Sequence, residues 1–181
     1  MIFFTSDQHF CHANIITMCD RPFSDVDEMN NTLIAYWNAM IGDNDEIYIL
    51  GDLFYKCSGH TANTIIRKLN GKKYLIKGNH EKYLTDPQFD PAVFEWVKEY
   101  YELAYKDSRF ILFHYPILEW AHYWRKSVHL YGHNHRPRTP VSEHLDKRAI
   151  NVGVDVNGFI PISAEVIYRR AFNDIESANY F

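Results

Sequence analysis

The sequence predicts an α/β layered protein, and three features of the chain indicate it. Short apolar runs recur, each bounded by Gly, Asp, Asn or Pro, as buried strands are. Segments with helical periodicity lie between the first of these runs and near the end of the chain. The 181 residues are 46% apolar and contain no internal repeat or low-complexity tract. We therefore expect one domain over residues 1–181 with enough apolar material for a full core.

Six apolar runs are expected to form the strands. Each is rich in Ile, Phe, Leu, Val or Tyr, which favour the pleated surface of a buried sheet. The runs are residues 2–6, 46–50, 73–77, 109–114, 128–132 and 149–153. Because helical segments separate the first strands, an α/β arrangement in layers is favoured over an all-β fold.

Three segments are expected to be helical. Ser24 with Asp27 three residues later resembles a capping box at the start of the first helix. Apolar residues then follow at helical spacing, namely Met29, Leu33, Ile34, Trp37 and Ile41. The second segment, 60–71, ends in Asn-Gly, which is typical of a helix C-terminus. Ser163 opens the third segment, which continues to residue 170.

Composition and charge exclude several classes of function. The net charge is −4 and the pI is about 6.2, whereas proteins that hold long nucleic acids are usually basic, so long nucleic acid is an unlikely partner. No stretch approaches the roughly 18 apolar residues of a membrane span, and the first ten residues do not resemble a signal peptide. The three cysteines, Cys11, Cys19 and Cys57, are odd in number and unpatterned, as reduced thiols are. We expect a cytoplasmic protein.

Polar residues that bind metals or phosphate follow five of the expected strands in turn. The segments are Asp7-Gln8-His9, Gly51-Asp52, Gly78-Asn79-His80, His114, and Gly132-His133-Asn134-His135. Glycine beside several of them allows the backbone to turn tightly. Because loops at the carboxyl ends of strands in open α/β sheets converge on one crevice, we expect these side chains to meet in one place.

The chemistry of these side chains indicates divalent metal ions. Imidazole, carboxylate and amide oxygen, without thiolate, suit Mn, Fe, Zn, Ni or Co. The candidate ligands are Asp7, His9, Asp52, Asn79, His114, His133 and His135. Seven ligands are too many for one ion that keeps an open position. Shared between two ions, with one carboxylate as a bridge, they provide four protein ligands to each.

In order and spacing, these motifs resemble the calcineurin-like metallophosphoesterase superfamily along nearly the whole chain. The resemblance implies an αββα layered sandwich, in which two facing mixed β-sheets are flanked by helices, and a dinuclear metal centre. It assigns Asp7, His9 and His135 to the first metal, Asn79, His114 and His133 to the second, and Asp52 to the bridge. His80 is implied to face the substrate phosphate and its leaving oxygen.

The implied activity is that of a metal-dependent phosphoesterase, either a phosphatase or a phosphodiesterase. A hydroxide between two metal ions would attack the phosphorus in line, and His80 would assist the leaving group. Manganese is the ion most suited to an assay, and the expected substrate is a small phosphoester, with nucleotides and oligonucleotides among the candidates. The alternative is a non-catalytic metal-binding scaffold on the same fold. Such members lose ligands or the histidine of Gly-Asn-His, and this chain retains both.

Substrate contacts are expected from His12, Arg21 and Arg136, which lie close to the ligand motifs in the sequence. An arginine can hold a phosphate oxygen, and a histidine on the rim can contact the substrate. The alternatives are a capping or solvated histidine and arginines in solvated turns. The segment 119–126 interleaves aromatic and cationic residues, which fits either contact with a nucleotide or packing of a helix.

Two residues depart from the pattern of similar small bacterial and viral relatives. Cys11 stands where those chains have glycine, and its side chain is expected to narrow the rim of the site. Glu81 follows Gly-Asn-His where an aspartate is common. Such an acidic residue can orient the catalytic histidine, and the glutamate is one methylene longer. Neither departure removes a metal ligand.

Overall fold

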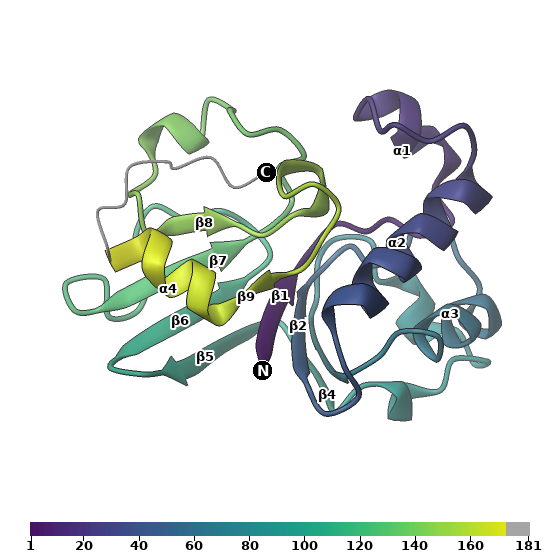
Figure 1. Ribbon diagram of the computed structural model, residues 1–181, viewed down its shortest axis with the longest axis horizontal. Helices are drawn as coiled ribbons and strands as arrows, with labels where there is room; N and C mark the ends of the chain where they lie inside the picture. The colour runs from purple at the N-terminus through teal and green to yellow at the C-terminus, as the bar shows by residue number, and fades with distance from the viewer. Residues whose placement is uncertain (173–181) are drawn as a thin grey trace.

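The computed structural model describes residues 1–172 and contains two mixed β-sheets flanked by helices (Figure 1). The first sheet has the strand order β4-β3-β2-β1-β9 and the second has the order β5-β6-β7-β8. Strands of the first sheet are β1 (Ile2–Thr5), β2 (Glu46–Leu50), β3 (Lys72–Ile76), β4 (Trp96–Lys98) and β9 (Ile162–Ser163). Strands of the second are β5 (Tyr100–Tyr105), β6 (Ser108–Phe113), β7 (Ser127–Tyr131) and β8 (Ala149–Asn151).

Parallel pairing dominates both sheets, and each has one antiparallel edge strand. In the first sheet, β1 to β4 pair in parallel, and β9 pairs antiparallel with β1. In the second, β6, β7 and β8 pair in parallel, and β5 runs antiparallel to β6. The six strands expected from the sequence are confirmed to within two residues at each end. The carboxyl ends of β1, β2, β3, β6 and β7 therefore carry the five polar segments.

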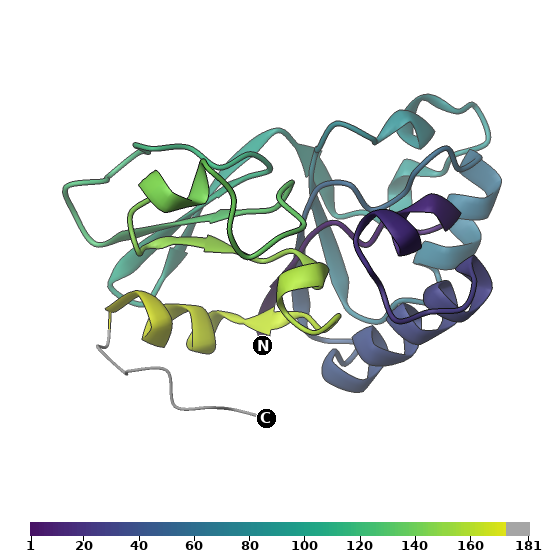
Figure 2. The same ribbon diagram turned by 90° about the horizontal axis from the view of Figure 1, so that it is seen from above.

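Two apolar cores give the protein its layers. Side chains that alternate along β1 face opposite ways: Phe4 enters the core shared with the second sheet, where Phe110 and Leu130 lie, and Phe3 enters the core beneath the helices. Phe4 and Phe110 have ring centroids 5.6 Å apart across the two sheets. Figure 2 shows the resulting order from above, with the second sheet, the first sheet and the layer of helices α2 (Val26–Met40) and α3 (Gly59–Ile66) side by side.

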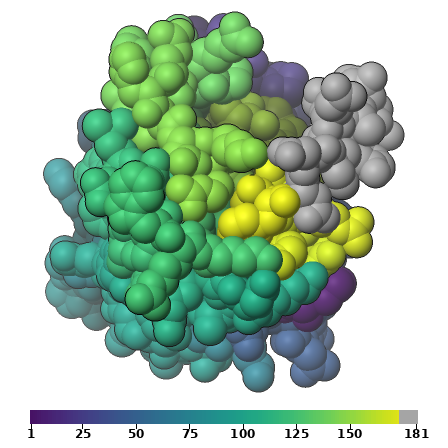
Figure 3. Space-filling view, turned by 90° about the vertical axis from the view of Figure 1, so that its left-hand side faces the viewer, coloured from purple at the N-terminus to yellow at the C-terminus, as the bar shows by residue number. Residues whose placement is uncertain are grey.

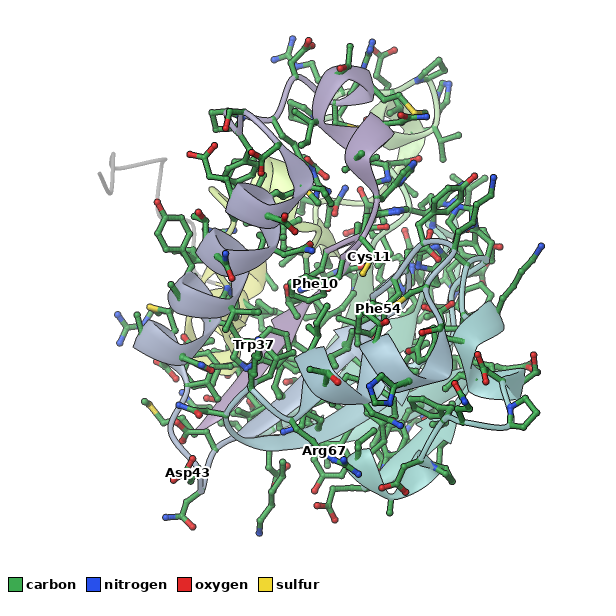
Figure 4. The ribbon with its side chains drawn as sticks, turned by 90° about the vertical axis from the view of Figure 1, so that its right-hand side faces the viewer. Phe10, Cys11, Trp37, Asp43, Phe54 and Arg67 are labelled. Carbon is green, nitrogen blue, oxygen red and sulfur yellow. The ribbon has the colours of Figure 1, made fainter. Side chains whose placement is uncertain are left out.

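Helix α2 (Val26–Met40) covers the outer face of the first sheet and packs Trp37 into its core (Figure 4). The expected helix is confirmed, but its cap is not Ser24. Asp25 accepts hydrogen bonds from the N–H groups of Asp27 and Glu28. The Glu28 carboxylate instead accepts from the N–H and hydroxyl of Ser24, so the roles within the capping motif are shifted by one residue.

The other helices are α1 (Ala13–Met18), α3 (Gly59–Ile66) and α4 (Ala164–Phe172). Helix α3 ends several residues before the expected Asn-Gly signal, and Gly71 serves in the turn into β3 with a φ of +88°. Helix α4 is confirmed, and Ser163 accepts a hydrogen bond from the N–H of Val166. Four short 3-10 helices are described at Lys82–Thr85, Pro91–Val93, Ser142–His144 and Val154–Val156.

Helix α4 and an irregular segment cover the second sheet. Ile167 of α4 joins the core between the sheets, and Figure 3 shows α4 in yellow beside the green and teal segments of this side of the molecule. In segment 119–126, Trp120 is buried and its Nε1–H donates to Ser127 Oγ at 2.9 Å. The hydroxyl of Tyr123 donates to Asp146 at 3.0 Å. Half of this segment therefore packs on the sheet, while Trp124 is exposed.

Four elements were not expected from the sequence, namely α1, β4, β5 and β9. Helix α1 has six residues, no side-chain cap and no charged residue in its end turns, so it lacks the signals that mark a helix. Strand β5 is half exposed at a sheet edge and includes a glutamate, which weakens its apolar pattern. Among the described residues, the longest helices fall short of the length and apolar character that a membrane span requires.

Candidate metal centre

The structure brings all seven expected metal ligands together at the carboxyl ends of β1, β2, β3, β6 and β7. The rings of His9 and His135 have centroids 4.9 Å apart, and those of His114 and His133 are 5.2 Å apart. Asp7, His9, Asp52 and His114 are buried, whereas Asn79 and His133 are exposed. One side of the cluster therefore lies within the protein and the other faces solvent.

The loops after β1 and β2 hold each other in place through backbone hydrogen bonds. The N–H of Asp7 donates to the carbonyl of Gly51 at 3.0 Å, and the N–H of His9 donates to the carbonyl of Asp52 at 3.1 Å. Asp7, His9 and Asp52 all have a positive φ, between 53° and 60°. Such a backbone is uncommon outside glycine and costs about 1–3 kcal/mol per residue. Strain of this kind is typical of functional sites.

Within the described residues, three groups of three side chains have donor atoms close enough to share one ion, and two of the three consist only of expected ligands. One group is Asp7, His9 and His135, and the other is Asp52, His114 and His133. Each set of donor atoms lies within 4.8 Å of one another. The first group holds the three residues that the resemblance assigns to the first metal, and the second holds His114 and His133 together with Asp52, which the resemblance assigns to the bridge.

Asp52 lies between the two groups and uses its two oxygens differently. Oδ1 accepts hydrogen bonds from the N–H groups of Asn79 at 2.9 Å and His80 at 3.0 Å. Oδ2 lies 3.7 Å from Nε2 of His9 and 3.5 Å from Nε2 of His114. One oxygen is therefore fixed by the loop after β3, while the other is directed at a histidine of each group.

Asn79 completes the second group. Its Oδ1 lies 3.1 Å from Nε2 of His114 and 3.1 Å from Nδ1 of His133. The remaining nitrogen of His114, Nδ1, donates to the carbonyl of Leu50 at 2.7 Å, which leaves Nε2 free to act as a ligand. The amide oxygen and the two imidazoles thus converge on one point beside Asp52.

The charges of the cluster are strongly coupled. Burial raises the pKa of Asp7 to about 6, and burial together with the nearby His135 lowers the pKa of His9 to about 3. Burial opposes protonation of His114, but hydrogen bonding to Asp52 and the charge of Asp7 prevail and raise its pKa to about 9. In the same way, burial opposes ionisation of Asp52, but contact with His114 prevails and lowers its pKa.

Two glycines allow the ligand loops to approach so closely. A Cβ on Gly78 would lie 2.8 Å from the backbone nitrogen of Asp52 and would overlap its carboxylate. A Cβ on Gly132 would overlap the hydroxyl of Ser6 and the carboxylate of Asp7. With glycine there, the N–H of His133 reaches Asp7 and donates to Oδ2 at 2.9 Å. The glycines of Gly-Asn-His and Gly-His-Asn-His are thus required by packing against the two carboxylates.

His80 lies at the edge of the cluster, and its side chain is 33% exposed. Its Nε2 is 3.9 Å from Oδ2 of Asp52, and neither three-residue group includes it. The ring packs edge-on against Tyr55, with centroids 4.9 Å apart. This position gives the imidazole access to a bound molecule while its backbone N–H holds Asp52.

Arg21 lies behind the ligands rather than at the substrate face, which corrects the expected phosphate contact. It is 4% exposed, and its guanidinium donates to both oxygens of Asp155 at 2.8 Å. It also donates to the carbonyls of Asp7 and Gln8, at 2.8 Å each. With its nitrogens engaged in this way, Arg21 supports the loop that carries Asp7. Asp155 was missed in the sequence because no motif surrounds it.

His12 also lies beside a ligand. It is buried, its Nδ1 is 3.2 Å from Nδ1 of His9, and its ring stacks on Tyr55 with centroids 3.9 Å apart. Burial lowers the pKa of His12 to about 4, so one of the two neutral rings donates to the other. His12 therefore supports His9, and it is neither of the expected alternatives, because it is buried and its side chain makes no capping hydrogen bond with α1. Arg136 is exposed next to His135.

The two departures from the expected pattern make their hydrogen bonds with groups other than the ligand side chains. Cys11, which Figure 4 labels, has a φ of 68°. Its sulfur lies 3.5 Å from that of Cys57. The Glu81 carboxylate accepts from the N–H groups of Leu53 at 3.3 Å and Gly78 at 2.7 Å. Glu81 thus links the backbones of the loops that carry Asp52 and His80, and these bonds do not involve the imidazole of His80.

Comparison with known proteins identifies related sequences and one related fold. The family description "Calcineurin-like phosphoesterase" matches residues 1–151. An uncharacterized protein of Methanocaldococcus jannaschii is 34% identical, over 96% of this chain and 97% of that protein. The gene 66 protein of Mycobacterium phage L5 is 31% identical, over 91% of each chain.

Among solved structures, a protein of unknown function from Aquifex aeolicus superposes with a TM-score of 0.73. The two chains are 24% identical, and the superposition covers 92% of this chain and 97% of that one. At this level of identity the similarity demonstrates a shared fold.

Proposed function

Because the chain belongs to the calcineurin-like phosphoesterase family, we propose that it hydrolyses a phosphoester bond with the help of two divalent metal ions. The observation that carries this proposal is the pair of three-residue groups beside one shared carboxylate. Two metals with a bridging carboxylate are one solution that proteins use to stabilise displacement at phosphorus.

The residues present fit such a centre. Nε2 of His9 is buried and has no hydrogen-bond partner among residues 1–172, although burying a polar atom without a partner is costly. Its Nδ1 is taken up by His12, so Nε2 is directed at Asp7, Asp52 and His135. A cation at this point would satisfy the orphaned nitrogen and offset the two buried carboxylates.

Each ion would be held by four side chains. Asp7, His9, His135 and Asp52 would hold the first, and Asn79, His114, His133 and Asp52 would hold the second. Their oxygen and nitrogen donors suit Mn, Fe, Zn, Ni or Co, with manganese the first choice for an assay. Bound divalent ions supply Lewis acidity, which lowers the pKa of water and offsets charge on phosphoryl oxygens.

His80 would act on the substrate directly. Its backbone is fixed by the hydrogen bond to Asp52 and its ring by Tyr55, while the side chain remains partly exposed. An imidazole held beside the leaving oxygen would donate a hydrogen bond or a proton to it as the P–O bond breaks. Arg136, exposed after His135, would contact an anionic substrate from the rim.

The substrate is expected to be a small phosphoester. The net charge of −4 disfavours a long nucleic acid, and nucleotides and short oligonucleotides remain the candidates to assay first. Segment 119–126 gives no support for a nucleotide, because it lies at the amino ends of β6 and β7, where the N–H of Arg109 donates to the carbonyl of Lys126, while the ligands follow the carboxyl ends.

A panel of substrates tests the proposed function. The metal-free protein, reconstituted with Mn²⁺, is assayed on p-nitrophenyl phosphate, its bis ester, nucleotides, cyclic nucleotides and dinucleotides. We expect turnover of at least one class, which a chelator abolishes and added metal restores. Asp146→Asn, which alters a carboxylate paired with Arg148 away from the ligands, should retain it. Two bound ions without turnover on the panel would favour the non-catalytic scaffold.

A further inference from the structure

A carboxylate lies directly behind one of the histidines of the first group. Nδ1 of His135 is 2.6 Å from Oδ2 of Asp155. The side chain of Asp155 is buried, with 4% of its surface exposed. The other nitrogen of the same ring, Nε2, lies 4.0 Å from Oδ1 of Asp7. The imidazole of His135 is thus placed between a carboxylate at its back and the expected metal position at its front.

Arg21 fixes that carboxylate. It forms two parallel hydrogen bonds with Asp155, from Nε to Oδ1 and from one terminal nitrogen to Oδ2, both at 2.8 Å. This paired geometry orients a carboxylate more strictly than a single contact does. The same guanidinium donates to the carbonyls of Asp7 and Gln8. Arg21 therefore ties the loop of Asp7 to the residue that holds His135.

The backbone around Asp155 is also tied to the site. Asp155 lies in the 3-10 helix Val154–Val156, which follows β8. The N–H of Val154 donates to the carbonyl of Ser6 at 3.0 Å, and Ser6 immediately precedes Asp7. The position of Asp155 is thus set from two directions, by Arg21 through its side chain and by Ser6 through the neighbouring backbone.

We propose that Asp155, held by Arg21, is a positioning residue that fixes the tautomer and the orientation of His135 for binding the first metal. A carboxylate at Nδ1 keeps the proton on that nitrogen and directs the lone pair of Nε2 toward the ion. It also makes the imidazole a stronger donor, as carboxylate partners of metal-bound histidines do. This inference rests on the proposed metal-dependent function.

The partners of the other ligand histidines differ in kind. Nδ1 of His9 faces His12, and Nδ1 of His114 faces the carbonyl of Leu50. Both partners are neutral, whereas Asp155 is charged and paired with a cation. Of these three histidines, His135 of the first group is the one whose Nδ1 faces a charged side chain. The loss of Asp155 should therefore weaken binding of the first ion and leave binding of the second unchanged.

The test is metal binding, measured without any substrate. Titration calorimetry with Mn²⁺ is performed on metal-free wild type, Asp155→Asn, Arg21→Lys and Asp146→Asn. Asp146 is the matched control, because it forms a similar pair of hydrogen bonds with Arg148, each 3.0 Å long. This pair does not involve the ligands. We expect Asp155→Asn to weaken one ion by about 10–100-fold and to leave the other unchanged. Asp146→Asn should leave both unchanged.

Arg21→Lys keeps the charge but loses the paired geometry, so it should weaken the same ion to a smaller extent. This variant provides the test if Asp155→Asn does not fold. The proposal would be overturned if Asp155→Asn bound both ions with wild-type affinity. If Asp155→Asn does not fold, wild-type affinity in a folded Arg21→Lys would overturn it. Equal weakening of both ions with a lower melting temperature of the metal-free protein would also overturn it, because Asp155 would then be purely structural.

A third arm distinguishes positioning from direct ligation. Cys19, His135 and Asp155 also have donor atoms within 4.8 Å of one another, so Asp155 would instead be a ligand if an ion lies there. Cys19→Ser should leave both affinities unchanged under our proposal, and Co²⁺ should show no thiolate absorption. Loss of an ion in Cys19→Ser would overturn the proposal. Because no substrate is used, these outcomes are independent of whether the protein hydrolyses phosphoesters.

Discussion

Oδ2 of Asp52 lies 3.7 Å from Nε2 of His9, although the two residues follow different strands. The same oxygen is 3.5 Å from Nε2 of His114, which comes from the second sheet. Oδ1 is occupied by two backbone N–H groups. One oxygen of Asp52 therefore lies beside a histidine from each sheet, and a substitution of Asp52 should affect metal binding by both ligand groups.

Asp52→Asn is expected to lower the occupancy of both metals and to abolish turnover, since it removes the charge that the two groups share. His135→Ala, by comparison, should weaken mainly the first metal, because His135 belongs to the group of Asp7 and His9. Elemental analysis of the two variants after dialysis measures the difference. If Asp52→Asn loses a single ion and still turns over, the bridging role is assigned wrongly.

His80→Asn is expected to retain both metals and the fold, because the imidazole of His80 belongs to neither ligand group. Turnover should fall, since a donor near the leaving oxygen is lost. The fall should be larger, by about tenfold or more, for alkyl or nucleotide esters than for aryl esters, because an alkoxide requires protonation more than p-nitrophenolate does. The measurement is kcat/KM on both ester types.

Two results would revise the role of His80. Equal losses on alkyl and aryl esters would reduce it to a residue that orients the substrate. A missing metal in His80→Asn, detected by elemental analysis, would make it a ligand, and the assignment of Asn79 would then need to change as well.

Gly132→Ala should weaken metal binding, because the new methyl group would overlap the Ser6 hydroxyl and the Asp7 carboxylate. Gly42→Ala is the matched control, since its Cβ would meet its nearest neighbour, Asp45 Oδ2, at an ordinary 3.6 Å. Calorimetric titration with Mn²⁺ compares the two variants. Wild-type affinity in Gly132→Ala would show that the loop can move away without displacing Asp7.

The stability of the metal-free protein should depend on pH through His129. This histidine is fully buried, and burial lowers its pKa to about 4 despite the carbonyls of Ile111 and Tyr115 nearby. In the unfolded chain its pKa is about 6.5. The unfolded state thus binds the proton more readily between these values, so the contribution of His129 is fully present above pH 6.5 and lost as pH falls toward 4.

At about 1.4 kcal/mol per pKa unit, this loss amounts to about 3 kcal/mol. Denaturant unfolding of metal-free wild type and His129→Gln at pH 7.5 and 4.5 measures it, since the other histidines titrate in both proteins. The free energy of unfolding should fall less steeply with pH in His129→Gln. Parallel curves would mean that His129 is protonated in the folded protein.

The strands and their polar ends could be predicted because they are local features of the sequence. A buried strand requires a run of apolar residues, and the loop that follows it requires polar or small ones, so both appear as contiguous patterns. Asp7 and Asp52 meet because β1 and β2 pair in parallel, which places their carboxyl ends at one edge of the sheet. The contact of Asp7 with His133 also requires the two sheets to face each other with these edges on the same side. The candidate ligands could therefore be named before the fold was known.

The direction of a side chain could not be predicted in this way. Arg21 and His12 are near the motifs in sequence, but both lie behind the ligands. Arg21 is held there by its hydrogen bond to Asp155, and His12 by its contact with His9. Asp155 itself has no motif, and its role depends on a contact with a residue far along the chain. The edge strand β5 was missed for a related reason, since partial exposure removes its apolar periodicity.

The count of metal ions per chain tests the central claim most directly. Metal-free protein is reconstituted with Mn²⁺ and dialysed, and the number of bound ions per chain is measured by elemental mass spectrometry. The melting temperature is measured in parallel. We expect two ions per chain. Full activity, on the substrate class that the panel identifies, should require both ions. The melting temperature should rise, because ions that bind the folded state alone stabilise it. Full activity with one ion or none would contradict the two-metal centre.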